Sequence, residues 1–244
     1  MPAPVFTFTD FGFTSSYLGQ LEAAVIKEAP LSRVVLLQAD APVFNPRASA
    51  YLLSSLTDYL PSDSVVLAVV DPGVGSDRRA IAVKLKERWF VGPDNGLLAM
   101  MIMDEVSEVY EIVWQPAHLS SSFHGRDLFA VTGARLAAGK HVAMLPLEKS
   151  DLIGHSWPHS LSEVIYIDTY GNLVTGIPAH EVSTDMTVSC GIELFGHART
   201  FAEVPPGHLF WYENANGLLE IAQNQGSAAA TLGVDIGTEV HVQN

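Results

Sequence analysis

The chain has 244 residues, of which 48% are hydrophobic and 16% charged, so it can form one large domain or a domain plus a smaller one. Its formal net charge of −14 argues against a nucleic-acid partner, because phosphates require a basic surface. No apolar run approaches the roughly 20 residues of a membrane helix, so no membrane partner is expected. Cys190 is the single cysteine, which excludes an intrachain disulfide and makes the cytoplasm the expected location.

Residues 1–150 alternate strand and helix patterns. The apolar runs at 4–10, 33–40 and 64–71 predict strands. The amphipathic segments at 15–30, 46–61 and 126–139 predict helices. Continuous apolar strands separated by such helices are typical of a mostly parallel sheet with helices packed on it. We therefore expect an N-terminal α/β domain over residues 1–150.

The second part of the chain has a different residue pattern. Residues 146–159 are polar and bounded by prolines, which predicts a linker. From residue 160 to residue 244, short β runs are joined by Gly and Asn turns. This pattern predicts a smaller, antiparallel β domain, either a barrel or a sandwich.

Two aspartates share one kind of position in the predicted sheet. Asp10 ends the first strand and Asp71 ends the third. In open parallel sheets, ligands bind in the crevice beyond the carboxyl ends of the strands. Each aspartate alone is equally well explained as a cap of the following helix or turn. The pair together favours a ligand-binding crevice.

The stretch VVDPGVGSDRR follows the third strand. Gly73 and Gly75 permit a sharp turn that would bring Arg78 or Arg79 back beside Asp71. A carboxylate next to a guanidinium stays ionised and fixed in direction, which suits a catalytic group. The alternatives are a surface ion pair and a plain turn.

The segment SSSFHGRDLFA places a histidine just before a predicted helix. His124 is either a catalytic residue or an ordinary polar loop residue. Arg126 and Asp127 are expected to be structural, pairing with the loop or capping the helix. The histidines of the chain show no H-x-x-x-H or H-E-x-x-H spacing, so no metal site is expected from them.

Two glycine turns carry further polar candidates. In GPDNGLL, Asn95 could bind a base or a ribose, although PDNG is also a strong turn signal. In DTYGNLVTGIP, the side chains of Asp168, Tyr170 and Asn172 offer an acid, a ring and an amide to a ligand. A hairpin without a binding role is the alternative.

Six motifs occur in order along most of the chain: TDFG, VVDPGVGSDRR, FVGPDNGLL, FHGRD, IDTYGNLVTGI and GLLEIAQNQGSAA. Together they resemble the S-adenosylmethionine hydrolases, also called S-adenosylmethionine hydroxide adenosyltransferases, which are relatives of the fluorinating and chlorinating enzymes. The resemblance implies an N-terminal α/β domain and a C-terminal β-barrel. It also implies a homotrimer whose small-molecule substrate lies between the N-terminal domain of one subunit and the C-terminal domain of the next.

The resemblance also implies a role for each matched residue. Asp71, Arg78 and His124 match a triad that activates water, and Asp10 matches the aspartate that binds the ribose hydroxyls. The remaining substrate-binding residues implied by the matched motifs are Phe123, Asn95, Asp168, Tyr170 and Asn172. The halogenating relatives lack the aspartate and the histidine of the triad, so water is the expected nucleophile. S-adenosylmethionine would be the substrate, and no cofactor or metal is implied.

Two departures from the family pattern concern substrate identity. QADAPVF lacks the histidine that usually follows the second strand, and ENANGLLEIA has Ala215 and Asn216 where members tend to have a serine. Two other functions remain as alternatives. One is a metal-dependent phosphohydrolase with Asp10, Asp71, His124 and Asp127 as ligands. The other is a non-catalytic module that binds adenosine.

Overall fold

The computed structural model describes residues 2–243, and the chain forms two compact units. The first unit runs to Ala50 and resumes at Thr57–Trp157, and the second comprises Tyr51–Leu56 and the chain from Pro158 onward. Most of the predicted linker, residues 146–157, belongs to the first unit. Each unit is described separately below.

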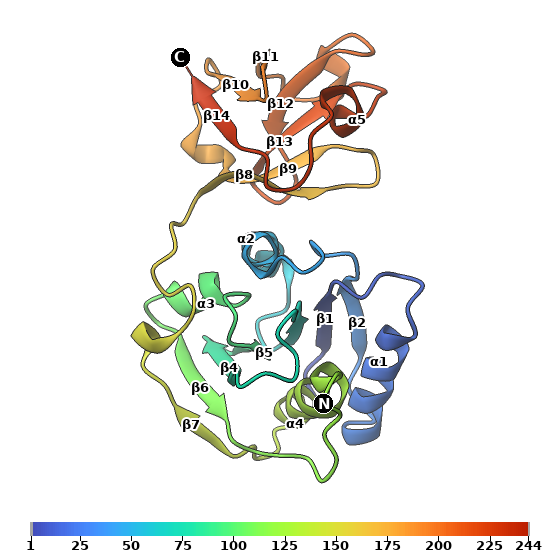
Figure 1. The fold of residues 1–244 in the computed structure, drawn as a ribbon, viewed down its shortest axis with the longest axis vertical. Coiled ribbons are helices and arrows are strands. Elements are labelled where there is room, and N and C mark those ends of the chain that lie inside the picture. Colours follow the sequence, from blue (N-terminus) through green and yellow to red (C-terminus); the bar gives the residue numbers. More distant parts are fainter. Residues whose placement is uncertain (1, 244) are drawn as a thin grey trace. The chain divides into compact units, whose positions relative to one another are not determined.

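The first unit contains a seven-stranded sheet (Figure 1). Its strand order is β2 (Val34–Gln38), β1 (Val5–Thr9), β3 (Val65–Val69), β5 (Arg88–Pro93), β4 (Ala80–Leu85), β6 (Glu108–Ile112) and β7 (Met144–Pro146). The pairs β2–β1, β1–β3 and β3–β5 are parallel, whereas β4 is antiparallel to both of its neighbours and β7 is antiparallel to β6. The sheet is therefore mixed, with its parallel part at β2–β1–β3–β5, because β4 and β5 form a hairpin.

The helices of this unit include the three that were predicted, at 15–30, 46–61 and 126–139, and one that was not predicted, at Ala99–Met103. They are α1 (Ser16–Glu28), α2 (Pro46–Leu56, whose last six residues fall in the second unit), α3 (Ala99–Met103), a π-helix at Gly125–Ala130 and α4 (Val131–Ala137). Short 3₁₀ helices lie at Thr57–Tyr59 and Lys149–Asp151. The Ser15 hydroxyl accepts a hydrogen bond from the Tyr17 amide at 3.1 Å and caps α1, which ends before Pro30. The predicted start and end of this helix are confirmed.

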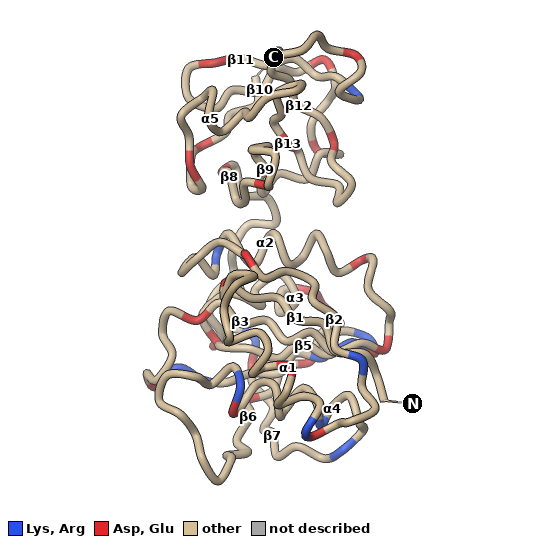
Figure 2. Tube along the Cα trace, turned by 90° about the vertical axis from the view of Figure 1, so that its right-hand side faces the viewer, with Lys and Arg blue, Asp and Glu red and all other residues tan. Residues whose placement is uncertain are grey.

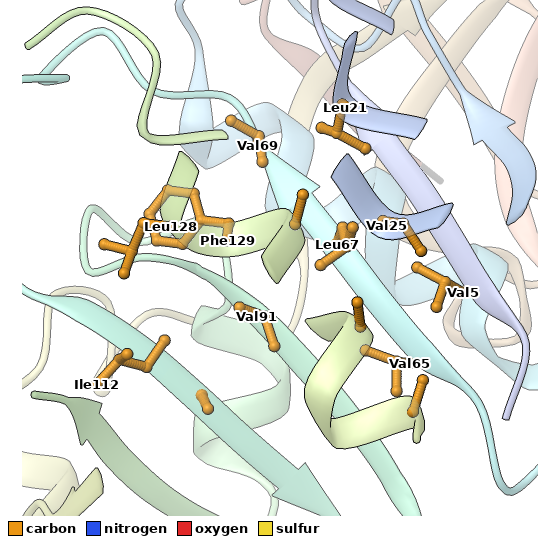
Figure 3. Close-up of a cluster of buried hydrophobic side chains, with 14 of the residues drawn as sticks. Val5, Leu21, Val25, Val65, Leu67, Val69, Val91, Ile112, Leu128 and Phe129 are labelled. Carbon is orange, nitrogen blue, oxygen red and sulfur yellow. The ribbon is translucent and has the colours of Figure 1, made fainter. Parts of the chain in front are cut away.

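An apolar core joins α1, the π-helix and α4 to one face of the sheet (Figure 3). Leu21 and Val25 of α1 and Phe129 of the π-helix are fully buried there. Gly133 allows α4 to approach β3, because a Cβ at this position would lie 2.3 Å from a methyl of Leu67. This packing fixes the π-helix, and hence the residue before it, next to the end of β3.

The second unit consists mainly of two antiparallel sheets. One has the order β12 (Leu209–Glu213), β13 (Leu218–Gln223), β9 (Leu173–Pro178) and β8 (Leu161–Ile167). The other has the order β11 (Glu193–Phe195), β10 (Thr187–Cys190) and β14 (Val240–Gln243). A short helix, α5 (Ala228–Leu232), and 3₁₀ helices at Ala179–Glu181 and Phe201–Glu203 complete it. Trp211 is fully buried in its core, and the predicted change to antiparallel β structure is confirmed.

Charge is distributed unevenly between the two parts of the sequence (Figure 2). Residues 158–244 contain ten acidic residues and one basic residue, Arg199. The other twelve of the 13 lysines and arginines precede residue 158. The second unit is therefore strongly acidic and favours cationic ligands.

Candidate functional site

The two strand-end aspartates line one cavity in the first unit. Strands β1 and β3 are parallel neighbours, with Thr9 opposite Val69, so the residues that follow them emerge at the same edge of the sheet. A cavity of about 290 Å³ lies at this edge. Its lining includes Asp10, Tyr17, Phe44, Asp71, Phe123 and His124. The topology thus brings together residues from three of the six motifs, TDFG, VVDPGVGSDRR and FHGRD.

Asp71 and Arg78 form a buried ion pair. The Arg78 Nε lies 2.8 Å from Oδ1 and 3.0 Å from Oδ2 of Asp71, and Nη2 also donates to Oδ2. The two side chains are only 5% and 8% exposed, respectively, which rules out the surface ion pair considered above. A guanidinium that donates from two nitrogens holds the carboxylate in one orientation.

The loop between the two residues has the conformation that the glycine pattern predicted. Gly75 has φ of +82°, and a Cβ there would lie 2.5 Å from the carbonyl oxygen of Ser121. Arg79 points to a different partner, since its Nε lies 2.9 Å from a carboxylate oxygen of the buried Asp94. The choice between Arg78 and Arg79, which local sequence rules left open, is settled by this geometry.

His124 is the third group at the ion pair. Its Nδ1 lies 3.1 Å from Nη2 of Arg78. Burial lowers the pKa of His124 below its ordinary value, the Arg78 charge lowers it further, and the charges of Asp71 and Asp127 oppose this shift. The π-helix begins at the next residue, Gly125, so the backbone that positions the ring is part of the packed core.

The two charged residues after Gly125 have structural contacts. Arg126 and Asp127 pair with each other through two hydrogen bonds of 2.6 and 2.9 Å. Asp127 also accepts a hydrogen bond from the Ser120 amide at 2.9 Å, and the Arg126 guanidinium lies 5.1 Å from the centre of the Phe123 ring. These contacts hold the loop that carries Phe123, whose side chain is buried against the rings of Phe11 and Tyr17.

Asp10 is held by a residue with unusual backbone geometry. The amide of Phe44 donates to Asp10 Oδ2 at 3.2 Å, and Phe44 has φ of +56°, a strained value for a non-glycine residue. Burial raises the pKa of Asp10, the Phe44 amide opposes this, and the charge of Asp71 raises it further. The role of Phe44 could not be read from sequence, since nothing local predicts its left-handed backbone.

Asn95 holds the backbone next to Asp71 by hydrogen bonds. Its Nδ2 donates to the carbonyl oxygen of Val70 at 2.9 Å, and its Oδ1 accepts from the Leu97 amide at 3.2 Å. It is not among the residues that line the cavity. Its amide therefore anchors the residue immediately before Asp71.

The polar candidates of the β domain lie in a second, larger cavity. This cavity of about 820 Å³ belongs wholly to the second unit and is lined in part by Asp168, Tyr170, Asn172, Phe201 and Glu220. Asp168 accepts hydrogen bonds from the amides of Tyr170 and Asn172 at 2.9 and 2.8 Å, which closes the turn. Asp168 also accepts one from the Asn172 side chain at 3.0 Å, and Tyr170 is 77% exposed.

Sequence analysis missed a buried carboxyl in this second cavity. Glu220 is 5% exposed and accepts hydrogen bonds from the Tyr212 hydroxyl at 2.5 Å and the Asn214 side chain at 2.9 Å. Burial raises its pKa, these two hydrogen bonds oppose the shift, and the charge of Asp168 adds to it. The sequence feature that could have predicted this burial is the position of an acidic residue inside the apolar run GLLEIA.

The pH dependence of stability tests this environment. Because the folded-state pKa of Glu220 is raised above 4.5, the folded chain binds its proton more tightly than the unfolded chain does. The free energy of unfolding should therefore fall as pH rises from 4.5 through the raised pKa. Replacing Glu220 with glutamine should remove this fall, so the variant gains stability relative to wild type as pH increases. Urea denaturation at several pH values measures this effect. The control is Glu213→Gln, because Glu213 is exposed. The same change in the pH dependence of the free energy of unfolding for both variants would contradict a raised pKa of Glu220.

Fold and site together define a class: a two-unit α/β protein with a buried Asp–Arg–His cluster beyond the ends of its parallel strands. The chain matches the family models for the SAM hydroxide adenosyltransferase N-terminal domain over residues 5–146 and for the C-terminal domain over residues 162–241. The chain belongs to the S-adenosylmethionine hydroxide adenosyltransferase family.

Individual relatives agree with the family match. An (R)-S-adenosyl-L-methionine hydrolase from Thermus thermophilus is 35% identical over 260 residues, which cover 98% of this chain and 99% of that protein. The enzyme of the same name from Salinispora arenicola is 34% identical, with coverages of 96% and 95%. The crystal structure of an uncharacterized conserved protein from Thermotoga maritima superimposes with a TM-score of 0.82 at 29% identity, covering 98% of this chain and 100% of that one.

Proposed function

We propose that this protein hydrolyses S-adenosyl-L-methionine to adenosine and L-methionine by attack of water at the ribose C5′. The observation that carries the proposal is the buried Asp71–Arg78–His124 cluster on the wall of a cavity that also contains Asp10. The relatives at 34% and 35% identity are named for hydrolysis of this substrate. Since their names specify the (R) epimer at sulfur, we propose that epimer as the preferred substrate.

The chemistry requires an oriented nucleophile more than it requires an acid. The leaving group is a cationic sulfonium that departs as a neutral thioether, so it needs no proton and no metal to leave. A single water must be positioned in line with the C5′–S bond and must lose a proton as the new bond forms. Asp71 accepts the proton in this proposal, and a positioned base contributes about 10² to 10⁴ in rate. Asp10 would bind the ribose hydroxyls.

The acidic second unit suits a cationic substrate. The large cavity is lined by the carboxylates of Asp168 and Glu220, and no lysine or arginine is among its lining residues within 2–243. A negative potential at such a cavity attracts a sulfonium that also carries an ammonium group. We propose that Asp168, Tyr170 and Asn172 contact the methionine and adenine side of the substrate, and that Phe123 contacts it on the side of the first unit. Asn95, which was predicted to bind the substrate, instead lies outside the cavity lining and holds the backbone at Val70.

We further propose a homotrimer in the cytoplasm, with each active site formed by the first unit of one subunit and the second unit of the next. Each unit has a cavity lined by residues of the matched motifs, which supports this arrangement. We also propose that the two C-terminal sheets close into one barrel. Backbone hydrogen bonds between Val164 and the segment at Gly237–Thr238, and between Trp211 and the segment Gly196–Ala198, support closure at both edges. Within residues 2–243, no helix has the length and apolar character that a bilayer crossing requires.

The two alternatives receive less support. A metal-dependent phosphohydrolase would need Asp71 and Asp127 as ligands, but each carboxylate is already paired with an arginine. Among residues 2–243, no group of three or more His, Cys, Asp or Glu side chains is arranged to hold a metal ion. A non-catalytic adenosine module would not require a buried ion pair beside a neutral histidine.

Incubation of the purified protein with each epimer of S-adenosylmethionine tests the proposal. In the presence of EDTA, chromatography should show equimolar adenosine and methionine, with faster release from the (R) epimer. Phosphohydrolase activity that is abolished by EDTA would favour the metal enzyme. Tight binding of adenosine without turnover of either epimer would favour the binding module.

A further inference from the structure

The hydrogen bond between Arg78 and His124 determines which nitrogen of the imidazole carries the proton. A guanidinium has five N–H donors and no acceptor. Arg78 Nη2 lies 3.1 Å from Nδ1 of His124, so Nδ1 must accept this hydrogen bond with its lone pair. In the neutral ring, the proton therefore resides on Nε2.

The guanidinium cannot turn away to release this constraint. Its Nε and Nη2 are engaged with both oxygens of Asp71, and its Nη1 lies 3.4 Å from the carbonyl oxygen of Arg79. The ring of Phe129 lies beneath it, with its centre 5.2 Å from Cζ. Protonation of Nδ1 would place two donors against each other at this contact.

The charges around the ring agree with a neutral imidazole. Burial and the Arg78 charge lower the pKa of His124, outweighing the opposing charges of Asp71 and Asp127. Asp10 is the other carboxyl that lines the same cavity. Within residues 2–243, Nε2 of His124 has no hydrogen-bond partner, so its N–H is available to a molecule in the cavity.

We propose that His124 acts as a hydrogen-bond donor to the attacking water through Nε2–H, and that Asp71 is the only proton acceptor of the reaction. This inference rests on the proposed function. The water oxygen forms the bond to C5′, and the C5′–S bond breaks with its electron pair going to sulfur. The water proton passes to Asp71 and then to solvent. Nε2–H stabilises the negative charge that develops on the oxygen as that proton leaves.

Asp71 retains the capacity for this role despite its ion pair. A carboxylate has about four acceptor positions, and the three Arg78 contacts involve Oδ2 twice and Oδ1 once. Oδ1 therefore keeps a lone pair for the water.

Three substitutions of His124 separate a donor from a base. Glutamine places an N–H near the position of Nε2 but has no basic nitrogen. Asparagine keeps a polar group beside Arg78 but does not reach the Nε2 position, and alanine removes both. For a donor, His124→Gln should retain at least about a tenth of kcat. The asparagine and alanine variants should lose about 10².

An equal loss of about 10² in all three variants would overturn the donor role. Adenosine binding and thermal unfolding of each variant verify that the cavity and the fold are intact. The second measurement uses the unmodified protein: ¹⁵N NMR of labelled histidine should show a protonated Nε2 and an unprotonated Nδ1. The opposite tautomer at neutral pH would refute the inference. If wild type releases no adenosine, the proposed function fails, whereas the NMR result still reports on the hydrogen bond.

Discussion

Replacement of Asp71 with asparagine is expected to lower kcat for adenosine release by at least about two decades. The amide keeps the shape of the side chain but cannot accept a proton from water. It also leaves the buried Arg78 without its anionic partner, since both side chains are less than a tenth exposed. Single-turnover measurements with saturating S-adenosylmethionine report this loss directly.

A matched control lies in the same loop. Asp77 is exposed, so Asp77→Asn should leave kcat unchanged. Adenosine binding, measured by calorimetry, should persist in Asp71→Asn, because Asp10 and the aromatic side chains of the cavity are untouched. Wild-type turnover in Asp71→Asn would remove Asp71 from the catalytic machinery. A loss of adenosine binding together with turnover would instead indicate that Asp71 has a structural role.

Replacement of Phe129 with alanine is expected to destabilise the protein by about 3–5 kcal/mol. Its ring is fully buried between the sheet and the π-helix, and removing it creates a cavity in the core shown in Figure 3. Arg78 also loses the ring beneath its guanidinium. Urea denaturation followed by circular dichroism measures the change in the free energy of unfolding.

The control for this prediction is an exposed phenylalanine. Phe13 is 65% exposed, so Phe13→Ala should change the free energy of unfolding by no more than about 0.5 kcal/mol. A loss of less than about 1 kcal/mol in Phe129→Ala would show that the core relaxes around the missing ring. In that case the packing would not be what holds the π-helix against β3.

Local patterns were sufficient for much of the first unit. Apolar runs that end in aspartate predicted the strands β1 and β3, and the Ser15 and Pro30 signals predicted the bounds of α1. These features depend on residues close in sequence, where side-chain periodicity and capping act directly. The run RAIAVKL predicted the strand β4 but not its antiparallel direction, because strand direction depends on which distant strand a segment pairs with.

By itself, the sequence determined the order of the motifs, the acidic character of residues 158–244 and the position of Asp10 and Asp71 at strand ends. Local residue patterns left open whether Arg78 or Arg79 reaches Asp71, and the tertiary structure places Arg78 there, as the family resemblance implied. Only the tertiary structure decided that Asn95 turns toward Val70 and that Glu220 is buried in a cavity. The physical reason is that a side chain's partner depends on the path of the backbone through a packed core. Neighbouring arginines with the same local surroundings can therefore meet different carboxylates.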